Sequence, residues 1–127
     1  MPVIRLAWPD SALLPNKRLG KHWSSTNAAK VAAKEAAYFA TKQAVGLWKA
    51  PDGPIPLSLI FCPPDKRRRD LDGALSSCKH ALDAMAQALG VDDSRFKPVL
   101  LDWGPSGKPG CVIVAVGVKI VTAQDLG

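Results

Sequence analysis

The residues between Gly73 and Leu89 constrain the fold more than any other part of this chain, because apolar side chains recur in them at helical spacing. The apolar stripe is formed by Leu75, Cys78, Leu82, Met85 and Leu89. Gly90 follows as a typical helix stop. Strand patterns precede this helix at residues 55–61 and follow it at residues 98–103. A helix between two strands favours a domain in which helices pack on a sheet.

Two further strand patterns and one further helix pattern complete the chain. Residues 2–8 alternate enough to form a first strand, and residues 111–121 form a last one. The alanine-rich residues 27–49 predict a helix of about six turns. This helix can be capped by Ser24, Ser25 or Thr26. Its expected core face carries Val31, Tyr38 and Val45. The order β-α-β-α-β-β predicts one α/β (α+β) domain over residues 1–127, with two main helices on a small mixed sheet of about four strands.

The net charge of the chain is +6, and all of it lies in the first part of the sequence. Residues 1–49 hold eight Lys and Arg residues against two acidic residues, whereas residues 50–127 hold nine of each kind. A basic half of this kind favours a polyanionic partner, either nucleic acid or an anionic membrane. An ordinary solvated surface explains the charge equally well.

No segment has the pattern of a membrane span or a secretion signal. The longest apolar run, at residues 111–118, is far too short to cross a bilayer. The first residues lack a charged segment followed by an apolar one, so we expect a cytoplasmic protein that does not bind membranes. The cysteines are Cys62, Cys78 and Cys111. Their odd number and wide spacing fit neither a disulfide framework nor a zinc site, so we expect reduced, buried thiols.

Two aspartates, Asp70 and Asp72, directly follow the four consecutive cations of residues 66–69, where a strand gives way to a helix. Side chains at positions i and i+2 of an extended segment point to the same side, so both carboxylates can approach one cation. Mg²⁺ in phosphoryl-transfer sites is typically held by one or two carboxylates, water and a substrate phosphate. A nuclease needs such a metal to activate water and to stabilise charge on phosphorus. The alternatives are that Asp70 pairs with a neighbouring arginine and that Asp72 caps the helix.

A second acidic pair and one lysine favour the nuclease interpretation. Asp92 and Asp93 lie just beyond the end of the predicted helix. Lys79 lies two turns into that helix, on the side that also carries Asp72 and Asp83. We expect Lys79 to bind a scissile phosphate or to assist the leaving oxygen. Its alternative role is that of an exposed, solubilising side chain.

One pattern runs through the segments "LLPNKRLGKHW", "RRRDLD" and "ALDAMAQALGVDDS". Together with Lys79 these segments resemble the RusA-type Holliday junction (crossover junction) endodeoxyribonucleases, a family common in prophages, over residues 8–96. The resemblance implies a homodimeric bacterial or phage enzyme that resolves four-way branched DNA by paired nicks in DNA recombination and repair. It implies Mg²⁺ as the cofactor, with Mn²⁺ as the alternative metal. The implied metal ligands are Asp70, Asp72 and Asp93, with Asp92 the less certain member of its pair. The resemblance also makes Lys79 necessary for cleavage.

One position departs from the family pattern. Members of the family commonly carry Asn directly after the second aspartate, where this chain has Gly73. Glycine is acceptable at the start of a helix, but the loss of an Asn that orients a carboxylate or a water would lower activity or loosen the metal. The alternative function is therefore a catalytically weak or inactive branched-DNA-binding protein of the same fold.

Chain geometry separates Asp93 from the other two implied ligands within one subunit. A straight helix over residues 73–89 spans about 25 Å, and residues 90–93 can return by at most about 10 Å. Asp93 would stay roughly 15 Å from Asp72, far beyond the ~2.1 Å of a Mg²⁺–oxygen bond. Either the helix is shorter or bent, or Asp93 of one subunit completes the site of the other in a two-fold dimer.

Basic and polar side chains provide the candidate DNA contacts. A compact cluster before the alanine-rich helix consists of Asn16, Lys17, Arg18, Lys21 and His22. We expect this cluster to grip the phosphate backbone, with Trp23 stacking on an unpaired base or packing beneath the loop. Further predicted contacts are Lys30 and Lys34 on the helix and Arg67, Arg68 and Arg69 beside the carboxylates.

Overall fold

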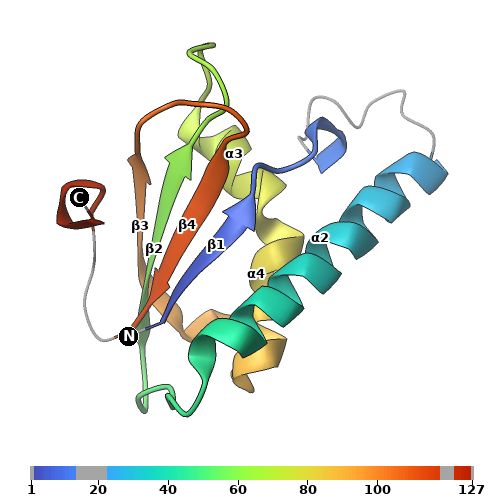
Figure 1. Ribbon diagram of the computed structural model, residues 1–127. Coiled ribbons are helices and arrows are strands. Elements are labelled where there is room, and N and C mark those ends of the chain that lie inside the picture. Colours follow the sequence, from blue (N-terminus) through green and yellow to red (C-terminus); the bar gives the residue numbers. More distant parts are fainter. Residues whose placement is uncertain (1, 14–22, 118–121, 127) are drawn as a thin grey trace.

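The computed structural model of the protein describes residues 2–13, 23–117 and 122–126. In this part of the chain the α-helices lie on one face of a four-stranded mixed sheet, and the short 3-10 helix near the C-terminus lies on the other side (Figure 1). The main elements are β1 (Val3–Ala7), α2 (Trp23–Val45), β2 (Ile55–Cys62), α3 (Leu71–Ser77), α4 (Lys79–Leu89), β3 (Phe96–Trp103) and β4 (Cys111–Val116). The order is thus β-α-β-α-α-β-β, and the predicted α/β class with a four-stranded mixed sheet is confirmed.

The strands lie in the order β1-β4-β2-β3. Strand β4 pairs antiparallel with β1 and with β2, whereas β2 and β3 are parallel. Two adjacent parallel strands need a crossover connection on one face of the sheet, and here α3 and α4 form that connection. The carboxyl ends of β2 and β3 therefore lie at the same edge of the sheet, which is the upper edge in Figure 1.

Helix α2 begins at Trp23, earlier than the sequence indicated. Ser24, Ser25 and Thr26 lie inside the helix, so the prediction that one of them caps it is wrong. Thr26 is buried in the folded protein. Burial outweighs the modest helix propensity of threonine at this position, because tertiary packing routinely overrides propensity.

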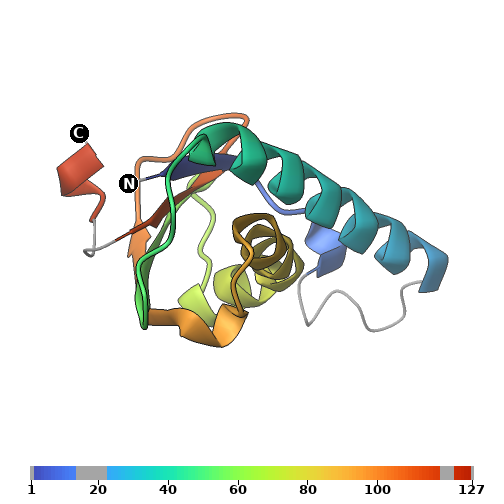
Figure 2. The same cartoon turned by 90° about the horizontal axis from the view of Figure 1, so that it is seen from below.

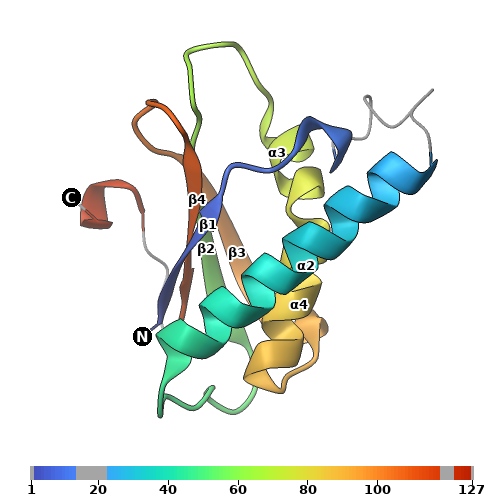
Figure 3. The ribbon, with the colours of Figure 1, turned by 45° about the vertical axis from the view of Figure 1, so that its right-hand side comes forward.

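The buried face of α2 is turned relative to the predicted one. Ala37 and Thr41 are fully buried, whereas the side chain of Val31 is 46% exposed. Tyr38 and Val45 are half-buried. A seven-residue repeat drifts by about 20° per heptad around an α-helix, so these three side chains do not share one buried face, and the prediction is wrong for Val31. The small side chain of Ala37 suits a close approach of α2 to α4, which α2 crosses in Figure 3.

The predicted helix over residues 73–89 is in fact two helices, α3 and α4, with a break at Cys78. The Ser77 hydroxyl donates to the carbonyl of Ala74 at 2.7 Å, and the N–H of Cys78 donates to the carbonyl of Leu75 at 3.0 Å. Bonds to the third preceding residue tighten the chain and interrupt the regular helix. Gly90 ends α4 with φ 71°, so the predicted helix stop is confirmed.

The core lies between the sheet and its helices, which Figure 2 shows on the same side of the strands. Strand β2 is buried almost throughout because it has strands on both sides and helices across one face. Its fully buried members are Ile55, Leu57, Ser58, Leu59, Ile60 and Phe61. Met85 on α4 is also fully buried, as the helical stripe predicted.

Among the described residues, no helix combines the length and the apolar character that a bilayer crossing requires.

Two large apolar side chains are exposed on and just after α2. The side chain of Phe39 is 67% exposed, and that of Leu47 is 99% exposed. Each of these two apolar side chains would gain free energy if another molecule covered it.

Candidate functional site

Asp70 and Asp72 lie at the start of α3, just beyond the carboxyl end of β2. Asp70 is the residue before the first helical turn, with an extended backbone of φ −104° and ψ 153°. Its carbonyl accepts the N–H of Ala74 at 3.2 Å, but its carboxylate caps no backbone N–H. Both side chains are exposed. Neither carboxylate has an ion-pair or hydrogen-bond partner among the residues that the structure describes.

The neighbouring arginines bind a different carboxylate, that of Asp65. Arg67 approaches one Asp65 oxygen at 3.1 Å, and Arg69 approaches the other at 2.8 Å. The backbone N–H of Arg67 also donates to Asp65 at 3.0 Å. This N–H and the two guanidinium groups hold the pKa of Asp65 well below its usual range. Two alternatives were considered for the aspartate pair: an arginine partner for Asp70 and a capping role for Asp72. Neither interaction is present among the described residues.

Arg69 is the most constrained of the three arginines. It donates to the backbone carbonyls of Asp65 and Arg67, and its guanidinium lies 5.3 Å from the centre of the Trp8 ring. Its side chain is only 21% exposed. Arg69 therefore fixes the shape of the loop, whereas Arg68 is exposed and has no such partner among the described residues. Of the three predicted phosphate contacts here, Arg68 is the one whose donors are not already engaged.

Lys79 is the first residue of α4, directly after the break at Cys78, and its side chain is exposed. The sequence placed it on the same helix side as Asp72 and Asp83. Lys79 and Asp83 are one turn apart within α4 and do share a face. Asp72 belongs to α3, so the break removes the continuous spacing on which its place beside Lys79 was predicted.

The second acidic pair lies where η2 (Asp93–Arg95) follows α4. The Asp92 carboxylate accepts the N–H of Ser94 at 2.9 Å, and this bond lowers the pKa of Asp92. Asp93 meets a third carboxyl group, that of Asp83 on α4. The hydrogen bond between these two carboxyl groups and the repulsion between their charges raise the pKa of Asp93.

The sequence did not indicate that Asp83 lies beside Asp93 and affects its pKa. The only signal for it was indirect: glycine after a helix often takes a left-handed conformation that reverses the chain, as Gly90 does here. The reversal brings Asp93 back beside the last turns of α4, where Asp83 lies.

The structure does not bring the three implied metal ligands together within one subunit. Asp70 and Asp72 follow the end of β2, whereas Asp93 precedes β3, which is parallel to β2. Ile55 pairs with Phe96 at one edge of this strand pair. The eight residues of β2 rise about 3.3 Å each from one to the next, which separates the two edges by roughly 23 Å. Among the described residues no group of three His, Cys, Asp or Glu side chains is arranged to hold a metal ion.

The whole predicted cluster of DNA contacts before α2 lies outside the described residues, namely Asn16, Lys17, Arg18, Lys21 and His22. Trp23 is the first residue of α2. On the same helix Lys34 is exposed and Lys30 is half-buried. Lys34 thus has the exposure that its predicted phosphate contact requires.

All three cysteines are free thiols, as expected. Cys78 and Cys111 are buried, whereas Cys62 is only partly buried. Burial raises the pKa of Cys78 to about 11. A buried thiol of high pKa is a poor nucleophile and a poor metal ligand, so Cys78 is a packing residue.

Comparison with known proteins gives no functional name. No family model matches the chain. An uncharacterized protein of Xylella fastidiosa strain Temecula1 is 35% identical over 98 residues, which is 76% of this chain and 63% of that protein. The chain thus spans somewhat less than two thirds of the length of the relative that it matches.

Proposed function

We propose that this chain is a Mg²⁺-dependent endodeoxyribonuclease that resolves four-way DNA junctions, as the resemblance to the RusA-type enzymes implies. One observation carries the proposal: Asp70 and Asp72 are exposed and have no partner among the described residues, while the nearby Arg67 and Arg69 bind Asp65. Two neighbouring carboxylates without a cationic partner repel each other. A structural role would give them a cap or an ion pair, whereas a ligand-binding role leaves their oxygens free.

The donor set of this pair fits Mg²⁺. Asp70 and Asp72 offer carboxylate oxygens, which are the ligands that Mg²⁺ prefers, and their exposure leaves room for water and for a phosphate. Mn²⁺ accepts the same ligands. When bound, the metal supplies an activated water and positive charge at the phosphodiester.

The cationic side chains beside the pair have roles of their own in this proposal. Arg68 binds a non-bridging phosphate oxygen of the DNA strand, since its guanidinium is not engaged by Asp65. Lys79 at the start of α4 holds the scissile phosphate and favours departure of the leaving oxygen. Lys34 and the basic residues before α2 bind the DNA backbone further from the cut.

The third carboxylate comes from a second copy of the chain in this proposal. The roughly 23 Å between the two edges of the β2–β3 pair is too large for Asp93 to reach its own Asp72. In a two-fold dimer, Asp93 of each subunit completes the site of the other, and two sites result. The exposed Phe39 and Leu47 support self-association, because exposed apolar side chains gain free energy on burial. Two sites in one dimer suit paired nicks on opposite strands.

Incubation with a synthetic four-way junction, with and without Mg²⁺, tests the proposal. The wild-type protein is expected to make symmetric nicks only when the metal is present. Asp70→Asn removes one ligand charge and should lower the cutting rate at least ~100-fold while junction binding persists. Glu35→Gln, which changes an exposed carboxylate on α2 away from both ends of the β2–β3 pair, is the matched control and should cut normally.

Two outcomes would count against the enzyme. Cutting by Asp70→Asn at the wild-type rate would remove Asp70 from the site. Tight junction binding without any metal-dependent nick would favour the alternative, a branched-DNA-binding protein that has lost cleavage, for which Gly73 is the suggestive residue. The biological setting that follows from the main proposal is DNA recombination and repair in a bacterial cytoplasm, with a phage or prophage as the source of the gene.

A further inference from the structure

The loop of residues 104–110, which joins β3 to β4, is held against the segment that leads from β2 to the aspartates. The N–H of Gly104 donates to the carbonyl of Phe61 at 2.9 Å, and the N–H of Gly107 donates to the carbonyl of Pro63 at 2.8 Å. At Gly110, an added Cβ would lie 2.8 Å from the backbone nitrogen of Pro64. The two segments therefore form one unit at the upper edge of the sheet.

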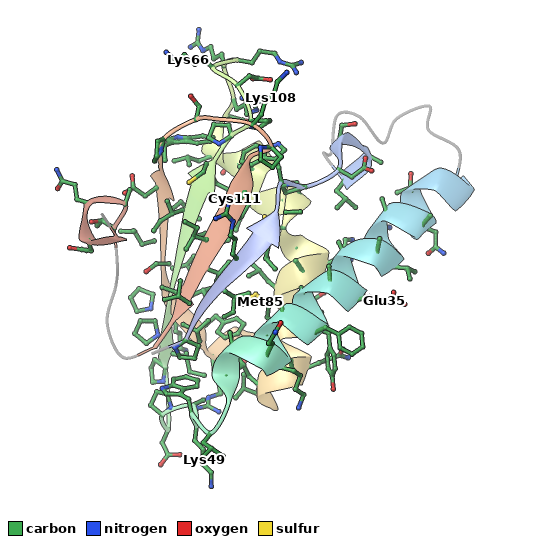
Figure 4. All side chains as sticks on the ribbon, viewed as in Figure 1. Glu35, Lys49, Lys66, Met85, Lys108 and Cys111 are labelled. Carbon is green, nitrogen blue, oxygen red and sulfur yellow. The ribbon has the colours of Figure 1, made fainter. Side chains whose placement is uncertain are left out.

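This contact brings Lys108 to the same end of the molecule as Lys66. Figure 4 shows both lysines at the upper end, with Lys49 at the opposite end. Lys66, Arg68 and Lys108 are all exposed. We use the name basic tip for these three residues.

The charge of the basic tip is not neutralised within the described part of the chain. Residues 65–69 and 104–110 contain five cationic side chains and a single carboxylate, that of Asp65. Arg67 and Arg69 occupy both oxygens of Asp65. The three tip residues have no acidic partner among the described residues. Such a concentration of unpaired positive charge raises the local concentration of an anionic ligand.

We propose that the basic tip binds the phosphate backbone of the DNA arm that enters the site, and that Lys108 is one of its contacts. The inference rests on the proposed function and adds a binding surface to it. Two tip residues, Lys66 and Arg68, lie shortly before Asp70 in the chain, so a strand held by the tip passes near the carboxylate pair. The hydrogen bonds from Gly104 and Gly107 fix the loop before DNA arrives, which lowers the entropic cost of binding.

Junction binding measured by fluorescence anisotropy in EDTA, over a series of salt concentrations, tests this surface without cleavage. Lys108→Gln should weaken binding about 3- to 10-fold near 0.1 M salt and should reduce the slope of log K against log salt by about 1. Lys108→Arg keeps the charge and should behave like the wild type. Lys49→Gln removes an exposed lysine at the opposite end and should change neither quantity. Circular dichroism melting of each variant verifies that it is folded.

Three other outcomes would overturn the proposed binding of DNA by the basic tip. Wild-type affinity and wild-type salt slope for Lys108→Gln would overturn the basic tip while leaving the proposed function intact. Junction binding that is absent in the wild-type protein would overturn the proposed function and this inference together. A loss of binding to anionic lipid vesicles, with DNA binding unchanged, would assign the tip to a membrane surface and would also overturn it.

Discussion

At the scale of single residues, neighbouring carboxylates in the loop before α3 have opposite roles. Asp65 binds both Arg67 and Arg69, whereas Asp70 binds neither, although Asp70 is adjacent to Arg69 in the sequence. The sequence could identify the acidic pair beside a cationic run but not the partner of each arginine. Arg67 and Arg69 bind Asp65 and not Asp70 because the backbone N–H of Arg67 also donates to Asp65. This N–H adds a third donor to the two guanidinium groups.

Replacing Asp65 by alanine tests this assignment through the pH dependence of stability. The pKa of Asp65 is lowered in the folded protein, so its contribution is present above the ordinary carboxyl pKa and is lost as pH falls through the folded-state value. Asp65→Ala should therefore be less stable than the wild type near pH 7, and the difference should shrink in strong acid. Urea unfolding followed by circular dichroism, at pH 7 and in strong acid, measures this difference in the free energy of unfolding. Equal stability of the two proteins at neutral pH would contradict the assignment.

At the scale of elements, periodicity predicted where helices lie better than how each one is shaped. The apolar stripe over residues 73–89 and the stop at Gly90 are both present in the structure. The break at Cys78 was not visible, because it depends on a hydrogen bond from Ser77 to a carbonyl that any helix would offer. The role of Asp83 depends on the reversal at Gly90, and single-residue spacing along a helix does not express such a reversal.

Gly90→Ala tests the importance of that reversal. Gly90 has φ +71°, and an added Cβ would meet nothing within 4 Å, so the cost is conformational and not steric. We expect the free energy of unfolding to fall by about 1 kcal/mol, measured by urea titration. Gly107→Ala is a matched control, since a Cβ there also meets nothing within 4 Å but the backbone is not left-handed. A loss of the same size in both variants would show that the conformation of Gly90 is not the cause.

At the scale of the whole molecule, the topology separates the predicted ligands. A parallel pair of strands has its carboxyl ends at one edge and its amino ends at the other, so Asp72 after β2 and Asp93 before β3 lie at opposite edges. The prediction of this separation assumed one straight helix over residues 73–89, which the break at Cys78 rules out, so the separation rests on the strand register instead. The sequence could not show whether a second subunit closes the gap, because nothing in one chain records how two copies pair.

Pairing of two inactive variants tests the shared site most directly. Asp72→Asn and Asp93→Asn are co-expressed with different affinity tags, and the mixed dimer is purified and incubated with a four-way junction and Mg²⁺. If each site combines Asp72 of one subunit with Asp93 of the other, the mixed dimer contains one intact site. We predict that it recovers single-strand nicking, whereas both homodimers of the variants stay inactive. A mixed dimer as inactive as the two homodimers would contradict the shared site.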